Sequence, residues 1–170
     1  MQKIAKFEKV SFENFAAAYL MFKGPTNIEI IMKIYEDINL PKRATTGSAG
    51  YDFFMPDAVL LKKGETVLVP TGIRVKINDG WVLKIYPRSG LGFKYRLQLD
   101  NTVGIIDSDY YYSDNEGHIF CKITCDAKEE KDVLLKKGSA FIQGIFLEYG
   151  ITFDDDVTEI RNGGFGSTNK

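Results

Sequence analysis

The sequence contains few of the residues that usually build metal and redox centres. Its 170 residues include a single histidine, His118, and two cysteines, Cys121 and Cys125. The cysteines lie four residues apart in an apolar segment, a spacing that does not match a zinc-ligand pattern. We therefore expect reduced core cysteines in a cytoplasmic protein. His118 is expected in a strand with a structural role, because no nucleophile can be paired with it from the sequence.

The sequence also lacks an excess of charge of either sign. Its 22 lysines and arginines against 23 aspartates and glutamates give a formal net charge of −1. Without a broad basic field, binding to polymeric nucleic acid is not expected. Any anionic ligand must instead be held by a few local cations.

Long hydrophobic runs are missing as well. The longest apolar run, residues 15–22, is far too short to span a bilayer. The first ten residues carry charges throughout and contain no signal-peptide core. We therefore expect no membrane association.

The first 38 residues predict a strand followed by two helices. Residues 3–10 place apolar residues among lysines and predict the strand. Ser11 can cap a helix over residues 12–22, because its hydroxyl can accept a hydrogen bond from the first turn. Aromatic side chains recur along one side of this helix: Phe12, Phe15, Tyr19 and Phe22.

A second short helix is predicted over residues 27–37. Gly24 and Pro25 end the first helix, and Thr26 with Glu29 forms a capping box for the second. The alternative for this segment is a strand, because isoleucine and methionine residues also alternate along it.

From residue 39 onward the sequence consists of short apolar runs separated by glycine, proline and aspartate turns. The spacing of about ten residues predicts an all-β sandwich or barrel rather than a parallel α/β sheet. One helical turn is expected near residues 90–95. The expected strands are 49–54, 58–61, 66–70, 73–77, 81–86, 97–99, 103–106, 118–125, 132–135 and 140–148.

At this length we expect one domain over residues 1–170. Residues 1–38 would form the strand and helical extension. Residues 39–160 would form the β core, and residues 161–170 a flexible C-terminal flap.

The most informative stretch is N-T-V-G-I-I-D-S-D-Y, residues 101–110. Its β-branched residues predict a half-buried strand, and Gly104 marks a bend, a bulge or a close approach. Two carboxylates, Asp107 and Asp109, follow beside aromatic residues. This pattern favours a pocket for a flat ligand with a reactive group near a carboxylate. An acidic turn at the end of a strand would explain the same residues.

Two further segments carry polar groups at strands. Pro87-Arg88-Ser89-Gly90 offers a guanidinium, a hydroxyl and an approachable backbone N–H, which together suit a phosphate. A surface turn is equally compatible. Gln143 lies within an otherwise apolar strand, so its amide is expected to be a hydrogen-bond hub or a ligand contact.

The C-terminal segment G-G-F-G-S-T, residues 163–168, can wrap a phosphate with backbone N–H groups. It is not a P-loop, because no lysine precedes Ser167. We interpret it as a flap that orders on a ligand, with Phe165 stacking on a base. The alternative is a disordered tail.

Taken in order, five segments resemble the motifs of the trimeric dUTPase family, from about residue 40 to the C-terminus. The resemblance implies a homotrimer of jelly-roll-like β subunits that hydrolyses dUTP to dUMP and pyrophosphate with Mg²⁺, in active sites shared among subunits. The segments are S-A-G-Y-D (48–52), P-R-S-G-L (87–91), N-T-V-G-I-I-D-S-D-Y (101–110), K-G-S-A-F-I-Q (137–143) and R-N-G-G-F-G-S-T (161–168).

The resemblance also implies a role for each matching residue. Asp107 would be the general base that activates water for in-line attack on the α-phosphorus, and Tyr110 would pack against the deoxyribose. Asp52 would position Mg²⁺ through water, and Gln143 would serve the α-phosphate region. The backbone of Asn101, Gly104, Ile105 and Ile106 would read the uracil edge. Phosphates would be held by Arg88, Ser89 and Gly90, and the flap residues Arg161, Phe165, Gly166, Ser167 and Thr168 would close over the nucleotide.

Several features depart from the family pattern, among them Arg96, which stands two residues after Lys94 where the family commonly has a glycine. Arg161 lies four residues before Phe165 rather than five, and Gly138-Ser139-Ala140 replaces Gly-Asp-Arg. A long acidic, tyrosine-rich loop over residues 111–116 follows Tyr110. The alternatives are a dCTP deaminase-like member of the same superfamily and a regulatory trimer that acts through a protein partner. The intact I-D-S-D-Y and flap segments favour the dUTPase assignment.

Overall fold

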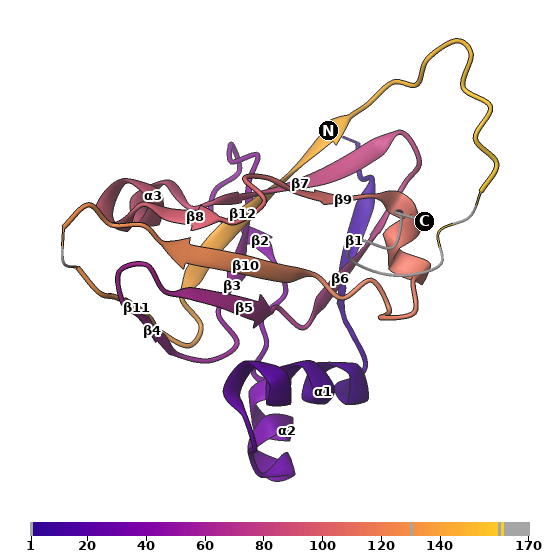
Figure 1. Cartoon of the computed structure of the whole chain (residues 1–170). Helices are drawn as coiled ribbons and strands as arrows, with labels where there is room; N and C mark the ends of the chain where they lie inside the picture. The colour runs from indigo at the N-terminus through magenta and orange to yellow at the C-terminus, as the bar shows by residue number, and fades with distance from the viewer. Residues whose placement is uncertain (1, 130, 160, 162–170) are drawn as a thin grey trace.

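Short antiparallel strands make up most of the fold, as the spacing of the turns predicts (Figure 1). The structure, a computed structural model, describes residues 2–129, 131–159 and 161. Each strand predicted from residue 49 onward is present, with its ends shifted by two residues at most. The strands are β1 (Ala5–Lys9), β2 (Lys42–Arg43), β3 (Tyr51–Phe54), β4 (Val59–Leu61), β5 (Thr66–Pro70), β6 (Ile73–Ile77), β7 (Trp81–Pro87), β8 (Leu97–Leu99), β9 (Gly104–Ile106), β10 (Phe120–Cys125), β11 (Val133–Leu135) and β12 (Ala140–Glu148).

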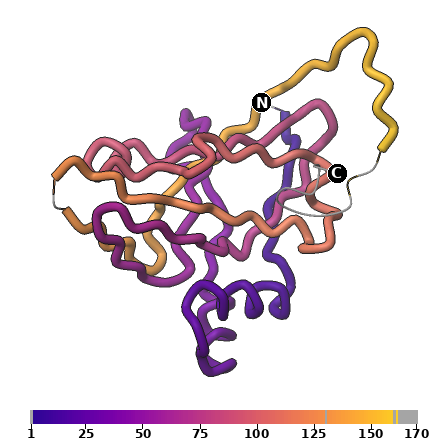
Figure 2. Tube along the Cα trace, viewed as in Figure 1, coloured from indigo at the N-terminus to yellow at the C-terminus, as the bar shows by residue number. Residues whose placement is uncertain are grey.

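The largest sheet has five strands in the order β2-β3-β12-β7-β9. A second sheet, β5-β10-β8, and two strand pairs, β1-β6 and β11-β4, complete the β structure. The whole arrangement is mostly β with few helices, so the predicted fold class is confirmed. After β12 the chain runs out from the β body, as Figure 2 shows.

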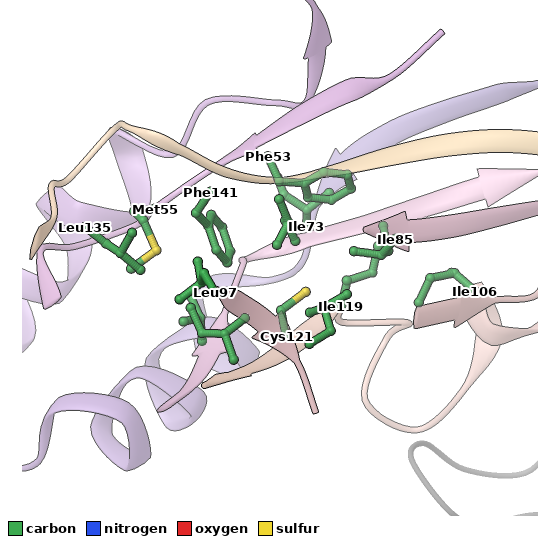
Figure 3. Close-up of a cluster of buried hydrophobic side chains, with 14 of the residues drawn as sticks. Phe53, Met55, Ile73, Ile85, Leu97, Ile106, Ile119, Cys121, Leu135 and Phe141 are labelled. Carbon is green, nitrogen blue, oxygen red and sulfur yellow. The ribbon is translucent and has the colours of Figure 1, made fainter. Parts of the chain in front are cut away.

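The main core cluster of aliphatic and aromatic side chains lies between the sheets (Figure 3). Phe53 on β3, Phe141 on β12 and Ile85 on β7 are fully buried within it. Both cysteines are buried there and free, as predicted. Burial of such side chains contributes about 1.5–3 kcal/mol each to folding. The core therefore holds β7 and β12, from which the candidate site extends.

The N-terminal segment forms helices α1 (Phe12–Lys23) and α2 (Ile28–Glu36), which pack against the end of the β body. The predicted Ser11 cap is confirmed, because its hydroxyl accepts from the Asn14 N–H at 3.2 Å. The predicted Thr26 cap is wrong: Asn27 caps α2 by accepting from the Glu29 N–H. The segment that forms α2 is a helix rather than a strand, because helical periodicity places Ile31 and Ile34 on the same buried face.

Three other predictions need correction. Helix α3 (Ser89–Tyr95) is longer than the single turn expected, and a 3₁₀ helix, η1 (Ser108–Tyr112), occupies part of the expected loop. His118 precedes β10 instead of lying in it, because its N–H donates to the Asn115 carbonyl and closes a turn.

Among the described residues, no helix has the length and apolar character needed to cross a membrane.

Candidate functional site

Strand β7 connects the two groups of predicted site residues. Its three middle residues pair with β9, with Leu83 opposite Ile106 and Ile85 opposite Gly104. A Cβ on Gly104 would lie 3.0 Å from the Cβ of Ile85. The glycine therefore lets β9 approach β7 closely, which is the packing reason for its place in this strand.

The far end of β7 carries a group of polar residues that we call the Arg88 cluster: Asp52, Arg88, Ser89, Gly90 and Gln143. Pro87 ends β7, and Arg88 is the N-cap residue of α3. Its guanidinium pairs with the Asp52 carboxylate at 3.2 Å. The structure thus brings together residues from three segments that the sequence separates by up to 91 positions (143 − 52).

Sheet register explains how the Arg88 cluster forms. Gln143 on β12 lies opposite Asp52 on β3 and opposite Tyr86 on β7. Its amide donates to the Pro87 carbonyl at 3.4 Å. The prediction that this amide finds a hydrogen-bond partner is therefore confirmed. Arg88 is 45% exposed and Asp52 is 17% exposed, so the cation faces outward over a largely buried carboxylate.

The near end of β7 carries a second group, the Asp107 cluster: Asp107, Asp109, Tyr110 and Arg161. Arg161 donates to the Asp107 carboxylate at 2.6 Å and to the Asp109 carboxylate at 3.0 Å. Its guanidinium also lies 5.8 Å from the centre of the Tyr110 ring. One arginine therefore pairs with two carboxylates just after β9, and the three groups together keep one negative charge. Asp107 remains 45% exposed.

Tyr110 is the buried member of the Asp107 cluster. Its hydroxyl donates to the His118 carbonyl and accepts from the Asn115 amide, each at 2.8 Å. Burial raises the pKa of the phenol, so the hydroxyl stays protonated at neutral pH. Tyr110 therefore fixes the 3₁₀ helix that follows Asp107.

His118 is a structural residue here. Its Nε2 accepts from the Gly72 N–H at 2.9 Å, so Nδ1 carries the proton and donates to Asn14 Oδ1. The side chain is fully buried. Burial lowers its pKa from 6.5 to about 4, so the ring is neutral at pH 7.

Stability is expected to fall as the pH is lowered from about 6.5 to 4. In this window the unfolded chain binds a proton at His118 that the folded chain does not, so protonation favours unfolding. A shift from 6.5 to about 4 corresponds to roughly 3 kcal/mol of unfolding free energy. Urea titrations at several pH values measure this loss. His118→Gln keeps a donor and an acceptor without titrating, and should remove most of the slope above pH 4.5.

The two clusters lie at opposite ends of β7. Because β9 runs antiparallel to β7, Asp107 falls beside Val82, six residues before Arg88. At about 3.3 Å per residue, these positions are roughly 20 Å apart. A single copy of the chain therefore does not bring Asp107 and Arg88 together.

Other predicted residues are placed as follows. Asn101 lies in the exposed turn before β9, and its carbonyl accepts from the Val103 N–H. Ile105 is half exposed, whereas Ile106 is buried in the core. Phe165, Gly166, Ser167 and Thr168 lie outside the described residues. Within the described part of the chain, no group of three or more His, Cys, Asp or Glu side chains could hold a metal ion.

The sequence alone did not reveal the pairing of Arg161 with Asp107 and Asp109. These residues are more than 50 positions apart, and opposite charges at such a distance carry no signal in a single sequence. The role of Asn115 was missed for a different reason, because its partner Tyr110 is only five positions away. Its place in an Asn-Glu-Gly turn indicates only the turn.

Comparison with known proteins agrees with this architecture. The dUTPase family model matches residues 36–169. The deoxyuridine 5'-triphosphate nucleotidohydrolase of Lactococcus lactis is 43% identical over 134 residues, which cover 77% of this chain and 88% of that protein.

Solved structures give the same result. The crystal structure of dUTPase from Streptococcus mutans has a TM-score of 0.63 and 33% identity, over 86% of this chain and 97% of that one. A dUTPase mutant from Staphylococcus aureus phage phi11, which coordinates a structural Mg(II) ion, shares the fold with a TM-score of 0.62 and 19% identity, over 92% of this chain and 98% of that one. The family match over most of the chain, together with these identities, shows that this chain belongs to the dUTPase family.

Proposed function

We propose that this protein hydrolyses dUTP to dUMP and pyrophosphate, with Asp107 as the general base. The observation that carries the mechanism is the separation of the Asp107 and Arg88 clusters along β7, by about 20 Å. A nucleotide that contacts both kinds of cluster must lie between subunits. This supports an assembly of several copies, and we propose a homotrimer in which the Asp107 cluster of one subunit faces the Arg88 cluster of another.

Uracil and sugar would be bound at the turn and strand before Asp107. The backbone of residues 101–106 carries N–H and carbonyl groups on a strand that is paired only with β7 in the described chain. Asn101, Gly104, Ile105 and Ile106 would present these groups to the uracil edge. Tyr110 would limit the space beside the deoxyribose, and Phe165 would cover the base.

The phosphates would be bound by the Arg88 cluster. Arg88 offers donors for a bidentate contact, and Ser89 and Gly90 add a hydroxyl and backbone N–H groups. Gln143 lies beside Arg88 and would contact the α-phosphate region. Arg161, Gly166, Ser167 and Thr168 would close over the β- and γ-phosphates.

The residues of the Arg88 cluster fit a magnesium ion that arrives with the nucleotide. Mg²⁺ usually keeps several waters and binds substrate phosphates with one or two carboxylates. The described residues offer Asp52 in this place but no cluster of carboxylates, so Asp52 would hold the ion through water. When bound, Mg²⁺ would offset negative charge on the triphosphate and on the leaving pyrophosphate.

Asp107 would accept a proton while water forms a bond to the α-phosphorus. The bond from that phosphorus to the α–β bridging oxygen breaks, and pyrophosphate leaves. The guanidinium of Arg161 now holds the Asp107 carboxylate at 2.6 Å. For proton transfer, Arg161 would have to turn toward the phosphates, so that the ligand itself releases the base.

The direct test is release of pyrophosphate from dUTP and the four common deoxynucleoside triphosphates, with and without Mg²⁺. Release from dUTP alone, dependent on Mg²⁺, supports the proposal. Ammonia release from dCTP would instead favour the dCTP deaminase-like alternative. Absence of both products would contradict the enzymatic assignment.

A further inference from the structure

Side chains of the segment after Asp107 form hydrogen bonds with three residues near the N-terminus. We call residues 111–118 the Tyr111 loop, and β1 with α1 (residues 5–23) the N-terminal unit. The family model begins at residue 36, so the N-terminal unit lies outside the part of the chain that it matches. The three contacts come from Glu116, Tyr111 and His118.

Glu116 makes the most direct contact. Its carboxylate accepts from the Ser11 N–H at 2.7 Å and from the Ser11 hydroxyl at 2.5 Å. Ser11 is the N-cap of the 12-residue helix α1, where the helix dipole favours an anion. Burial opposes ionisation of Glu116, but the two bonds from Ser11 and the charge of Arg74 outweigh it and lower its pKa. The contact is therefore charged at neutral pH.

Backbone geometry adds to this contact. Glu116 has a φ of +59°, a conformation that L side chains rarely adopt. Gly117, which follows it, packs directly on η1, because a Cβ there would lie 2.8 Å from the Tyr110 carbonyl oxygen. The loop thus packs against the residues that follow Asp107, and the Glu116 carboxylate binds the N-terminus of α1.

Tyr111 makes the second contact. Its hydroxyl donates to Glu8 on β1 at 2.6 Å, and the Arg74 guanidinium lies 4.4 Å from the centre of its ring. Arg74 also pairs with Glu8 at 3.2 Å. The third contact is the His118 bond to Asn14 on α1, at 2.9 Å. Each contact joins the Tyr111 loop to a different residue of the N-terminal unit.

Backbone hydrogen bonds connect this loop to Asp107 over a short stretch of chain. The Tyr110 N–H donates to the Asp107 carbonyl at 3.3 Å, and the Ser113 N–H and hydroxyl both donate to the Tyr110 carbonyl. A displacement of the loop therefore moves the backbone of Asp107. On the N-terminal side, the chain reaches Asp107 from the three-residue strand β9, and the side chain of Asp107 pairs with Arg161.

We propose that Glu116 is a positioning residue, through which the N-terminal unit holds Asp107 in place for catalysis. The proposal rests on the proposed function of Asp107 as the general base. A base displaced by about 1 Å can lose on the order of a hundredfold in rate. Binding of the nucleotide, in contrast, depends mainly on the strand before Asp107 and on the Arg88 cluster.

The test uses the full-length variants Glu116→Ala, Glu116→Gln and Ser11→Ala, with Glu13→Gln as the control. Glu13 lies in the first turn of the same helix but is exposed. Glu116→Ala is expected to lower kcat about 10- to 100-fold, with KM changed less than about threefold. Glu116→Gln keeps one acceptor and should lose less. Combining Ser11→Ala with Glu116→Ala should cost no more than Glu116→Ala alone, because both remove one contact.

Hydrogen exchange gives a readout that does not depend on activity. The amides of Ser113, Glu116 and His118 bond within residues 110–118 and should exchange at least about tenfold faster in Glu116→Ala. If wild type is active but Glu116→Ala keeps its kcat, the proposal is overturned. It is also overturned if kcat falls only in proportion to the folded fraction. If wild type does not hydrolyse dUTP, the proposed function fails, and unchanged exchange in Glu116→Ala would separately remove the anchoring role.

Discussion

Asp107→Asn is expected to lower kcat for dUTP at least about a hundredfold, the low end for loss of a general base. Asparagine keeps the shape of the side chain but cannot take the proton from water. Binding of dUTP should change little, because the base and phosphate contacts lie on other residues. Single-turnover pyrophosphate release, together with equilibrium binding of dUTP, separates these two effects.

Asp109→Asn is the matched control for this prediction. Both carboxylates bind the same guanidinium, with Arg161 at 2.6 Å from Asp107 and 3.0 Å from Asp109. The two variants therefore make the same change in charge beside Arg161. A large loss at Asp109 with little loss at Asp107 would assign the base to Asp109. Equal small losses would leave neither carboxylate as the base.

Arg88→Ala is expected to lower kcat/KM about 100- to 1000-fold, the usual loss for a donor that stabilises charge in the transition state. The substitution removes the cation nearest to Asp52 and leaves that carboxylate facing the phosphates. Arg88→Lys should recover part of the loss, since lysine keeps the positive charge but cannot form the bidentate hydrogen bonds of a guanidinium. Steady-state kinetics with dUTP over a range of Mg²⁺ concentrations measure the effect.

Arg96→Ala provides the comparison for Arg88. Arg96 lies at the other end of α3 and pairs with Asp126 at 3.2 Å, the same distance as the Arg88–Asp52 pair. Exposed ion pairs of this kind contribute about 0–1 kcal/mol, so Arg96→Ala should leave kcat/KM nearly unchanged. Equal losses in the two variants would mean that Arg88 acts only on the stability of α3.

Much of the fold could be predicted from the sequence because turn residues and apolar runs are local signals. Gly64, Gly80, Gly117 and Gly138 all have positive φ values in turns, as their place between apolar runs indicates. The helical cap at Ser11 was predictable for the same reason. The Thr26 cap was wrong because two adjacent residues, Thr26 and Asn27, both suit an N-cap, and only the packing of α2 decides between them.

The candidate site could be predicted only as a set of residues, not as an arrangement. The ordered motifs indicated Asp107 and Arg88, but their separation follows from the register of β7 and β9. The contact between Ser11 and Glu116 joins residues 105 positions apart. It depends on how α1 packs against the β body, which no local pattern records.

The central claim is that Asp107 and Arg88 of different subunits form one active site. Subunit complementation tests it most directly: Asp107→Asn and Arg88→Ala chains are mixed in equal amounts, refolded together and assayed for pyrophosphate release from dUTP. If each site takes these residues from two neighbouring subunits, random assembly restores both in about one quarter of the sites. The account predicts recovery to about a quarter of wild-type activity. Activity that stays at the level of the separate variants would contradict it, because both residues would then serve a site within one chain.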